Sequence, residues 1–366
     1  MGISILTLFG LLMVYSASMV VAAERAGSPS YYFVRQSLHA VAGYLLMIVL
    51  MLVDYHKWLR LRTILYLAAF SLTSLLLVFH HAPIKGAHRA LRIDLVSFQP
   101  SELAKLVILF YVAYFLQKQQ EIRHAGLRLL PCIFFVGLFT GLIVLEPDLG
   151  QALCILFIVT SLFFIAGLDW KYIAVAALPL LPLFYFFTWK VPFRRARILA
   201  WLAALRDPLN ADYHTRQTAI AVGRGGFLGV GFGKSRQKFF FLPEVIGDSI
   251  YALIGEELGL VGAVLVLAAY LGYLILGAKI SIKAPDRGGF YLGLGITLML
   301  ALQAFVNMST ALAIVPNKGL TLPFISQGGS SLVISLMATG ILLNISSQRK
   351  THPDDEEQPP DAKEQI

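Results

Sequence analysis

Ten apolar segments, separated by polar or turn-forming stretches, divide the sequence. They cover residues 3–23, 37–53, 64–79, 103–117, 129–145, 149–168, 172–189, 249–278, 288–315 and 330–347. A helix needs about 17–25 residues to cross the hydrocarbon core of a bilayer, and the segments fit this length, although the third, fourth and tenth are short. They lack the alternating polarity of transmembrane β-strands. The pattern therefore predicts an all-α integral membrane protein with about ten transmembrane helices.

The composition agrees with this pattern and excludes a soluble protein. Hydrophobic residues make up 57% of the 366 residues, charged residues 14%, and the mean hydropathy is +0.72. Soluble domains usually carry about 25% charged residues, so too few polar side chains are present to cover a water-facing surface. The same figures exclude a disordered chain, a coiled coil and a disulfide scaffold. Cys132 and Cys154 both lie in apolar segments, where cysteine usually acts as a small buried hydrophobe.

Lys and Arg are distributed unevenly between alternate loops, which predicts the orientation in the membrane. With a cytoplasmic N-terminus, the cytoplasmic loops and the C-terminal tail hold 13 basic residues, and the short outer loops hold 6. Both termini are therefore expected in the cytoplasm. The predicted organisation is one membrane domain over residues 1–348, with a large extracytoplasmic loop over 190–248. Residues 349–366, which are acidic and rich in proline, are expected to form a disordered cytoplasmic tail.

The predicted loop over residues 190–248 is strongly basic. It holds ten Lys and Arg against four Asp and Glu, and a loop of this length is uncommon unless it is functional. Two interpretations stay open: a solvated loop that touches lipid headgroups, or a site for an anionic, phosphate-bearing substrate. Six glycines lie between residues 223 and 233. They do not form a Walker A motif, because Leu228 occupies the position of its first glycine, and are expected to allow tight turns and close backbone approach.

Asp248 lies where this basic loop meets the eighth apolar segment. Aspartate is a favoured N-cap residue, so the side chain has a structural role available at the start of that helix. A carboxylate at the outer face of the membrane, beside many cations, also suits a general base. The sequence alone leaves both roles open.

Glu102 and Lys105 interrupt the fourth apolar segment. A spacing of three residues puts them on one helix face, and charges within a span are costly and usually face the protein interior. They are expected to form either a structural ion pair or part of a substrate cavity.

The stretch 307–331 contains prolines and glycines that prevent one continuous helix. It is expected to form a folded outer loop that dips toward a cavity, because non-helical backbone at membrane depth needs protein or water around it. Its candidate polar groups are Lys318, Ser330 and Ser331.

Four sequence blocks resemble the SEDS family (shape, elongation, division and sporulation), typified by RodA and FtsW. They are FQPSELAKL at 98–106, EPDLGQAL at 146–153, GVGFGKSRQKFFFLPEVIGDSIYALIGEELGLVG at 229–262, and the stretch 307–331. The blocks occur in the family's order and span nearly the whole chain outside the tail. The sequence KGLTLP at 318–323 looks more like FtsW than RodA, which favours a role in cell division over elongation.

The resemblance implies ten transmembrane helices and the polymerisation of peptidoglycan from lipid II. In that reaction the acceptor sugar's 4-hydroxyl attacks the anomeric carbon of the donor, undecaprenyl diphosphate leaves, and the anomeric configuration inverts. Asp248 matches the family's essential aspartate and is the predicted catalytic base. The predicted substrate-binding residues are Arg89, Glu102, Lys105, Arg194, Arg195, Arg197, Lys234, Arg236, Lys238, Lys318, Ser330 and Ser331.

The chain departs from the family's common pattern near these residues. Family members commonly have His-Thr before the aspartate, where Ile246 and Gly247 stand, and Tyr in place of Gln327. A Trp is also common where this chain has Leu91. These departures concern how Asp248 is oriented.

The resemblance also implies partners and a location. The expected partners are lipid II, a class B penicillin-binding protein that acts as transpeptidase, and other divisome or elongasome membrane proteins, with no nucleic acid. The expected location is the bacterial cytoplasmic membrane at the division septum. No metal-ligand spacing is visible and the sequence alone calls for no cofactor, but a dependence on a divalent cation (Mg²⁺ or Mn²⁺) stays open. The alternative function is a lipid II flippase, which would need a polar pathway between the two membrane faces.

Overall fold

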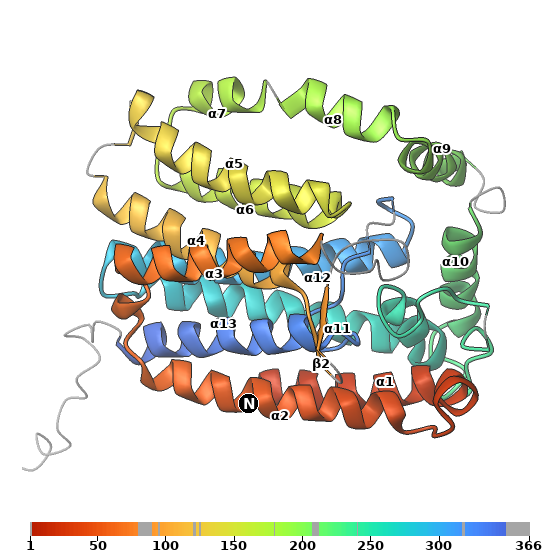
Figure 1. Ribbon diagram of the computed structural model, residues 1–366. Helices are drawn as coiled ribbons and strands as arrows, with labels where there is room; N and C mark the ends of the chain where they lie inside the picture. Colours follow the sequence, from red (N-terminus) through yellow and green to blue (C-terminus); the bar gives the residue numbers. More distant parts are fainter. Residues whose placement is uncertain are drawn as a thin grey trace, which may run out of the picture.

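A computed structural model describes residues 2–79, 90–93, 96–119, 122–123, 126–178, 180–206, 212–239, 241–316 and 319–348. The described part is a bundle of long, roughly parallel and antiparallel helices (Figure 1). The helices are α1 Gly2–Ala26, α2 Tyr31–Leu52, α3 Leu61–Val78, α4 Pro100–Lys118, α5 Leu130–Leu145, α6 Leu149–Ile165, α7 Trp170–Ala177, α8 Leu180–Trp189, α9 Pro192–Arg206, α10 Tyr213–Gly225, α11 Ile250–Ile282, α12 Arg287–Ala311 and α13 Gly329–Ser347.

The predicted all-α membrane architecture is confirmed. Seven helices in the described ranges are long and apolar enough to cross a membrane: α1, α2, α3, α5 with its preceding turn, α11, α12 and α13. The apolar helix α6 is shorter, at 17 residues. Nine of the ten predicted segments each coincide with one helix.

The seventh predicted segment differs from the expectation, since it forms two short helices, α7 and α8. Pro179 and Pro182 lie where the two helices meet. A proline lacks the backbone N–H of a helical residue and clashes with the preceding turn, so one continuous helix is not available there. In Figure 1, α7 and α8 lie along the outer edge of the bundle.

The centre of the bundle is formed by α12 and α13, with α4 packed against α12. Glycines allow the closest of these contacts. A Cβ built on Gly340 of α13 would lie 2.4 Å from the Met47 carbonyl oxygen of α2, so the α2–α13 packing depends on the absence of a side chain. A short hairpin of β1 Leu91–Ile93 and β2 Val96–Phe98 precedes α4.

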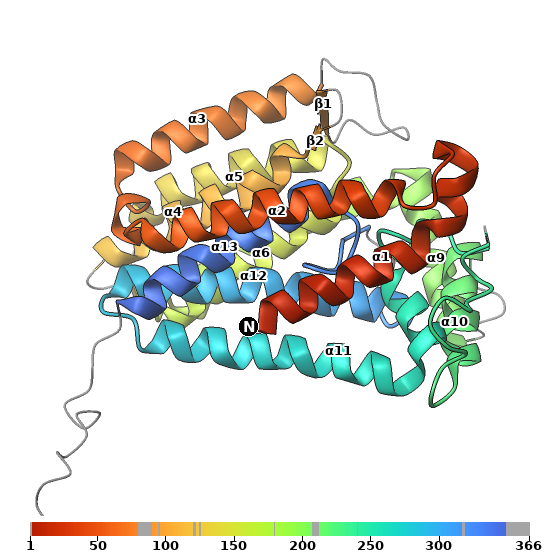
Figure 2. The same cartoon turned by 90° about the horizontal axis from the view of Figure 1, so that it is seen from below.

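The basic segment 190–248 contains secondary structure of its own. It holds α9 and α10, and both views place these helices at the end of the bundle where α11 begins (Figures 1 and 2). Two short 3-10 helices, η1 Tyr55–Lys57 and η2 Gly126–Leu129, lie in connections at other points of the chain. The predicted tail over 349–366 lies outside the described residues.

Candidate active site

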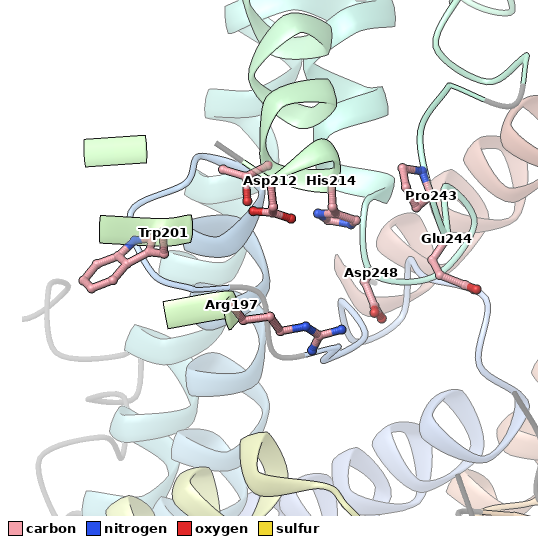
Figure 3. A pocket seen from close by; sticks show the side chains of 8 residues that line it. Arg197, Trp201, Asp212, His214, Pro243, Glu244 and Asp248 are labelled. Carbon is pink, nitrogen blue, oxygen red and sulfur yellow. The ribbon is translucent and has the colours of Figure 1, made fainter. Parts of the chain in front are cut away.

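Asp248 lines a cavity of about 230 Å³ at the N-terminal end of α11. Helix α9 contributes Arg197 and Trp201, and α10 with its N-cap contributes Asp212, His214 and Thr215. The turn before α11 contributes Pro243, Glu244 and Asp248. Figure 3 shows the Arg197 guanidinium extending toward the Asp248 carboxylate, while Glu244 lies on the other side of Asp248.

The turn that carries Asp248 is closed by hydrogen bonds to the backbone carbonyl of Glu244. The backbone N–H groups of Gly247 and Ser249 donate to the Glu244 carbonyl at 3.0 and 3.4 Å. Glu244 has a φ of +48°, a left-handed conformation that costs about 1–3 kcal/mol for a residue with a side chain. The N-cap position of α11 belongs to Ser249, which makes no side-chain capping bond. Asp248 therefore precedes the cap position and its carboxylate lines the cavity.

The loop between α12 and α13 supports this turn from the opposite side. Asn307 of α12 donates through Nδ2 to the carbonyl oxygens of Asp248 (3.0 Å) and Leu320 (2.6 Å). Ser326 donates to the Gly247 carbonyl at 2.7 Å, and the Gln327 N–H donates to the Ile246 carbonyl at 2.9 Å.

Ile246, Gly247 and Gln327 are three of the four positions at which the sequence departs from the common family pattern. The contacts between the two loops there are made to backbone carbonyls, and the bond between Ile246 and Gln327 uses backbone atoms on both sides. The two loops can therefore form these hydrogen bonds although the side chains at these positions differ from the common family pattern.

Gly319 lies directly against the Asp248 carboxylate. A Cβ built on Gly319 would be 3.2 Å from Asp248 Oδ2, and the residue has a φ of +66°. Both facts require glycine, because a side chain would crowd the carboxylate and strain the backbone. The stretch 307–331 thus forms the folded loop that the sequence predicts, and it reaches the cavity.

Among the predicted cations with described side chains, Arg197 is the one that lines the cavity. Arg195, Lys234 and Arg236 are exposed and lie outside its lining. Arg194 belongs to α9, but its side chain lies outside the described atoms. Arg89 and Lys318 also lie outside the described residues.

Lys238 has a different environment from the one expected for a substrate-binding cation. Its side chain is 1% exposed, and its Nζ donates to the Gly233 carbonyl at 2.6 Å and contacts Glu257 Oε1 at 3.4 Å. The Ser16 hydroxyl of α1 lies 2.7 and 2.8 Å from the two oxygens of the same carboxylate and donates its proton to that group. Lys238 therefore joins the basic segment to α1 and α11 and does not line the Asp248 cavity.

Glu102 and Lys105 form a buried ion pair, with Oε2 and Nζ 2.8 Å apart. Gln151 of α6 donates to Glu102 at 3.1 Å, and Lys105 donates to Gln303 of α12 at 2.8 Å. Neither charged residue lines the Asp248 cavity. The pair instead joins three helices inside the bundle.

The polar chain continues from Gln303 to the loop before α13. Gln303 Nε2 donates to the Thr321 carbonyl at 3.0 Å, and the hydroxyls of Thr321 and Ser331 are 2.9 Å apart. Ser330 accepts from the Gln99 N–H and donates to the Ser97 carbonyl, both at 2.9 Å. Ser331 therefore links the first turn of α13 to the preceding loop and to α12, and Ser330 links that turn to the β2–α4 junction.

His214 is a cavity residue that the sequence analysis missed. The Ser249 hydroxyl donates to the Pro243 carbonyl at 2.9 Å and lies 2.9 Å from His214 Nε2. Because the hydroxyl has one proton, Nε2 must donate to it. Burial lowers the pKa of His214, which favours the neutral ring at neutral pH. No motif spacing links His214 to Asp248, because the two approach each other only when α10 packs on α11.

The described residues contain no group of three His, Cys, Asp or Glu side chains placed to hold a metal ion.

The chain is similar along nearly its whole length to known proteins. A "Probable peptidoglycan glycosyltransferase FtsW" from Geobacter metallireducens is 40% identical over 352 residues, which cover 95% of this chain and 93% of the relative. "Stage V sporulation protein E" from Bacillus subtilis is 36% identical over 344 residues, covering 93% and 94%.

Solved structures show the same fold. The rod shape determining protein RodA from Thermus thermophilus matches with a TM-score of 0.68 at 26% identity, covering 96% of each chain. A chain from a structure titled "Structural coordination of polymerization and crosslinking by a peptidoglycan synthase complex" matches with a TM-score of 0.73 at 28% identity, covering 94% and 98%. The model of the family described as "Cell cycle protein", which unites FtsW, RodA and SpoVE, matches residues 1–351. The chain therefore belongs to this FtsW/RodA/SpoVE family, the SEDS proteins.

Proposed function

We propose that this SEDS protein, a peptidoglycan glycosyltransferase, polymerises lipid II with Asp248 as its general base. The observation that carries the proposal is the placement of the Asp248 carboxylate in a cavity opposite the Arg197 guanidinium. A single displacement at a sugar carbon needs one base for the attacking hydroxyl and a cation for an anionic leaving group. The cavity offers both kinds of group, and Asp248 and Arg197 come from separate elements of the chain.

In the proposed reaction, Asp248 accepts the proton of the acceptor sugar's 4-hydroxyl. The hydroxyl oxygen then forms a bond to the anomeric carbon of the donor, on the face opposite the leaving group. The bond between that carbon and the diphosphate oxygen breaks, and its electron pair leaves with undecaprenyl diphosphate. Attack from the opposite face inverts the anomeric configuration. Arg197 stabilises the negative charge that grows on the diphosphate.

The positions of Asp248 and Arg197 suit these two roles. Asp248 is held at its backbone by Asn307 and closely approached by Gly319, so its carboxylate has little freedom to move. Arg197 is carried by α9, which enters the cavity from another side. The base and the cation can therefore contact opposite ends of the reacting bond.

We place the cavity on the extracytoplasmic side, with both termini in the cytoplasm, because of the basic asymmetry of the loops. The relatives named FtsW and the sequence KGLTLP support septal synthesis over lateral synthesis. The similar chain in a complex that couples polymerisation to crosslinking supports a class B penicillin-binding protein as partner. Residues 1–348 would then form the membrane domain, and 349–366 a cytoplasmic tail.

The alternative is a lipid II flippase, and one assay separates the two functions. The purified protein, with its transpeptidase partner, is incubated with lipid II in detergent, where no membrane separates two compartments. A glycosyltransferase yields glycan strands and releases undecaprenyl diphosphate, detected by gel and mass spectrometry. A flippase yields neither product in detergent but moves labelled lipid II across the bilayer of a proteoliposome. Transport without polymer formation would contradict the proposed reaction.

A further inference from the structure

The glycine-rich segment between α10 and the Asp248 turn inserts into the hydrogen-bond ladder of α11. The N–H groups of Leu260 and Val261 donate to the carbonyls of Gly226 and Phe227, at 2.9 and 3.3 Å. In return, the carbonyls of Glu256 and Glu257 accept from the N–H groups of residues 230 and 231, both at 3.0 Å. In a regular α-helix those N–H and C=O groups would bond to one another. We call residues 226–232 the inserted loop.

Glycines make this insertion sterically available. Gly259 of α11 has a φ of +67°, which breaks the helix where the loop enters. A Cβ built on Gly229 would lie 2.2 Å from the Glu257 carbonyl oxygen. The loop and the helix are therefore in direct backbone contact, and the depth of the loop is set by the depth of residues 256–261.

Helix α1 gives that depth. Its apolar span, Gly2–Glu24, has 23 residues and a length of about 35 Å, close to the thickness of the hydrocarbon core. Glu257 is bonded to Ser16 of α1, whose apolar span ends at Glu24, eight residues or about 12 Å away. Because the hydrocarbon core is about 30 Å thick, residues at this level lie inside it.

The outer side chains of the inserted loop are apolar and uncovered. Phe227 is 68% exposed and Leu228 is 78% exposed, and Phe232 is also exposed. Leu260 of α11, whose N–H donates to the Gly226 carbonyl, is also exposed, as is Val264 one turn farther along the helix. Exposed Lys234 and Arg236 follow directly in the chain, and long basic side chains can extend from an apolar surface to anionic headgroups.

We propose that the inserted loop is a re-entrant element whose Phe227 and Leu228 side chains contact the acyl chains of the bilayer. Irregular backbone at membrane depth needs protein partners for its polar groups, and the exchange with α11 supplies them for the carbonyls of residues 226 and 227 and the N–H groups of residues 230 and 231. The apolar surface is continuous with the face that the membrane helix α11 presents outward, which identifies lipid as its occupant. The inserted loop thereby anchors the segment between α10 and the Asp248 turn in the membrane. This inference concerns membrane depth and does not depend on the reaction.

A spin-label measurement tests the proposed depth. In a protein with Cys132→Ala and Cys154→Ala, a nitroxide is attached at Leu228→Cys, and the protein is placed in nanodiscs of phosphatidylethanolamine and phosphatidylglycerol. Power saturation then compares collisions with oxygen, which concentrates in hydrocarbon, and with a water-soluble nickel chelate. Val264→Cys on α11 is the hydrocarbon reference, and Tyr213→Cys, at an exposed position of α10, is the water reference.

The label at Leu228 is expected to match the one at Val264, with frequent oxygen collisions and few nickel collisions. A label that matches Tyr213 would overturn the proposal, because the loop would lie in water. A label shielded from both reagents would also overturn it, because protein and not lipid would cover the loop. If the cysteine substitutions prevent folding, Leu228→Trp in the otherwise unchanged chain serves instead. Its added fluorescence, relative to the unsubstituted protein, is expected to be quenched by brominated acyl chains, and an absence of quenching would overturn the proposal.

Discussion

Asn307 holds two backbone segments next to the Asp248 carboxylate, one at Asp248 itself and one at Leu320. Its side chain is fully buried, and its Nδ2 bonds the carbonyls of Asp248 and Leu320. Both partners accept hydrogen bonds, which fixes the orientation of the amide. Because Asn307 does not line the cavity, we expect it to position Asp248 without touching substrate.

Asn307→Leu removes both bonds and leaves two buried carbonyls without this donor, at about 1–3 kcal/mol each. We expect kcat for polymerisation to fall about tenfold or more, which corresponds to about 1.4 kcal/mol, with little change in KM. Thr310→Val is the matched control, because the Thr310 hydroxyl donates to the Asn307 carbonyl of its own helix, and it should retain most activity. If both variants lowered kcat and raised KM to the same extent, the result would argue against a positioning role for Asn307.

Lys238 differs from the exposed cations of the same segment. Removing one partner of a buried ion pair costs about 3–5 kcal/mol, whereas exposed changes usually stay within about 0.5 kcal/mol. We expect Lys238→Ala to lower the melting temperature strongly, and Arg236→Ala to leave it nearly unchanged. Thermal unfolding in detergent measures both. Similar melting temperatures for the two variants would mean that the contact of Lys238 with Glu257 contributes little to stability.

At the scale of elements, buried polar groups join α6, α4, α12 and the loop before α13. Glu102 and Lys105 lie within this chain of hydrogen bonds and contact Gln151 and Gln303 on the neighbouring helices. The chain therefore fixes the helices that carry the loop on which Gly319 approaches Asp248. The sequence predicts the ion pair from its spacing, but the partners come from distant segments and cannot be read from the sequence.

Lys105→Ala leaves the Glu102 charge buried, so we expect poor expression or a melting temperature lowered by several degrees. The swap Glu102→Lys with Lys105→Glu restores the pair but presents the wrong groups to Gln151 and Gln303. We therefore expect it to recover folding, measured by size-exclusion chromatography, more than polymerisation. Full polymerisation by the swapped protein would remove both residues from the predicted site.

At the scale of the whole molecule, the apolar pattern predicts the bundle because each crossing helix needs its own uninterrupted apolar stretch. The division of the seventh segment follows from Pro179 and Pro182, which the sequence displays. The cavity is less predictable. Arg197 and His214 reach Asp248 through the packing of α9 and α10, and Lys238 is buried because Gly229 and Gly259 allow the inserted loop to pack on α11. Such contacts depend on tertiary structure that no local pattern encodes.

The orientation of the whole molecule in the membrane can also be tested. A cysteine at Arg216, on α10 of the basic segment, should react with a membrane-impermeant thiol reagent in intact spheroplasts. Lys57→Cys, in the turn between α2 and α3, is the matched control and should react only after lysis. The reverse labelling pattern would place the Asp248 cavity in the cytoplasm and contradict the proposed site.

The most direct test of the central claim is the polymerisation rate of purified Asp248→Asn. Asparagine nearly preserves the shape of aspartate but cannot accept the proton, and a general base contributes about 10²–10⁴-fold to rate. Asp212→Asn removes a carboxylate from the wall of the same cavity and controls for the loss of one negative charge. We expect Asp248→Asn to keep its melting temperature, to bind lipid II and to lose polymerisation by about that factor, while Asp212→Asn retains most of its activity. Near-normal polymer from Asp248→Asn would mean that Asp248 is not the general base.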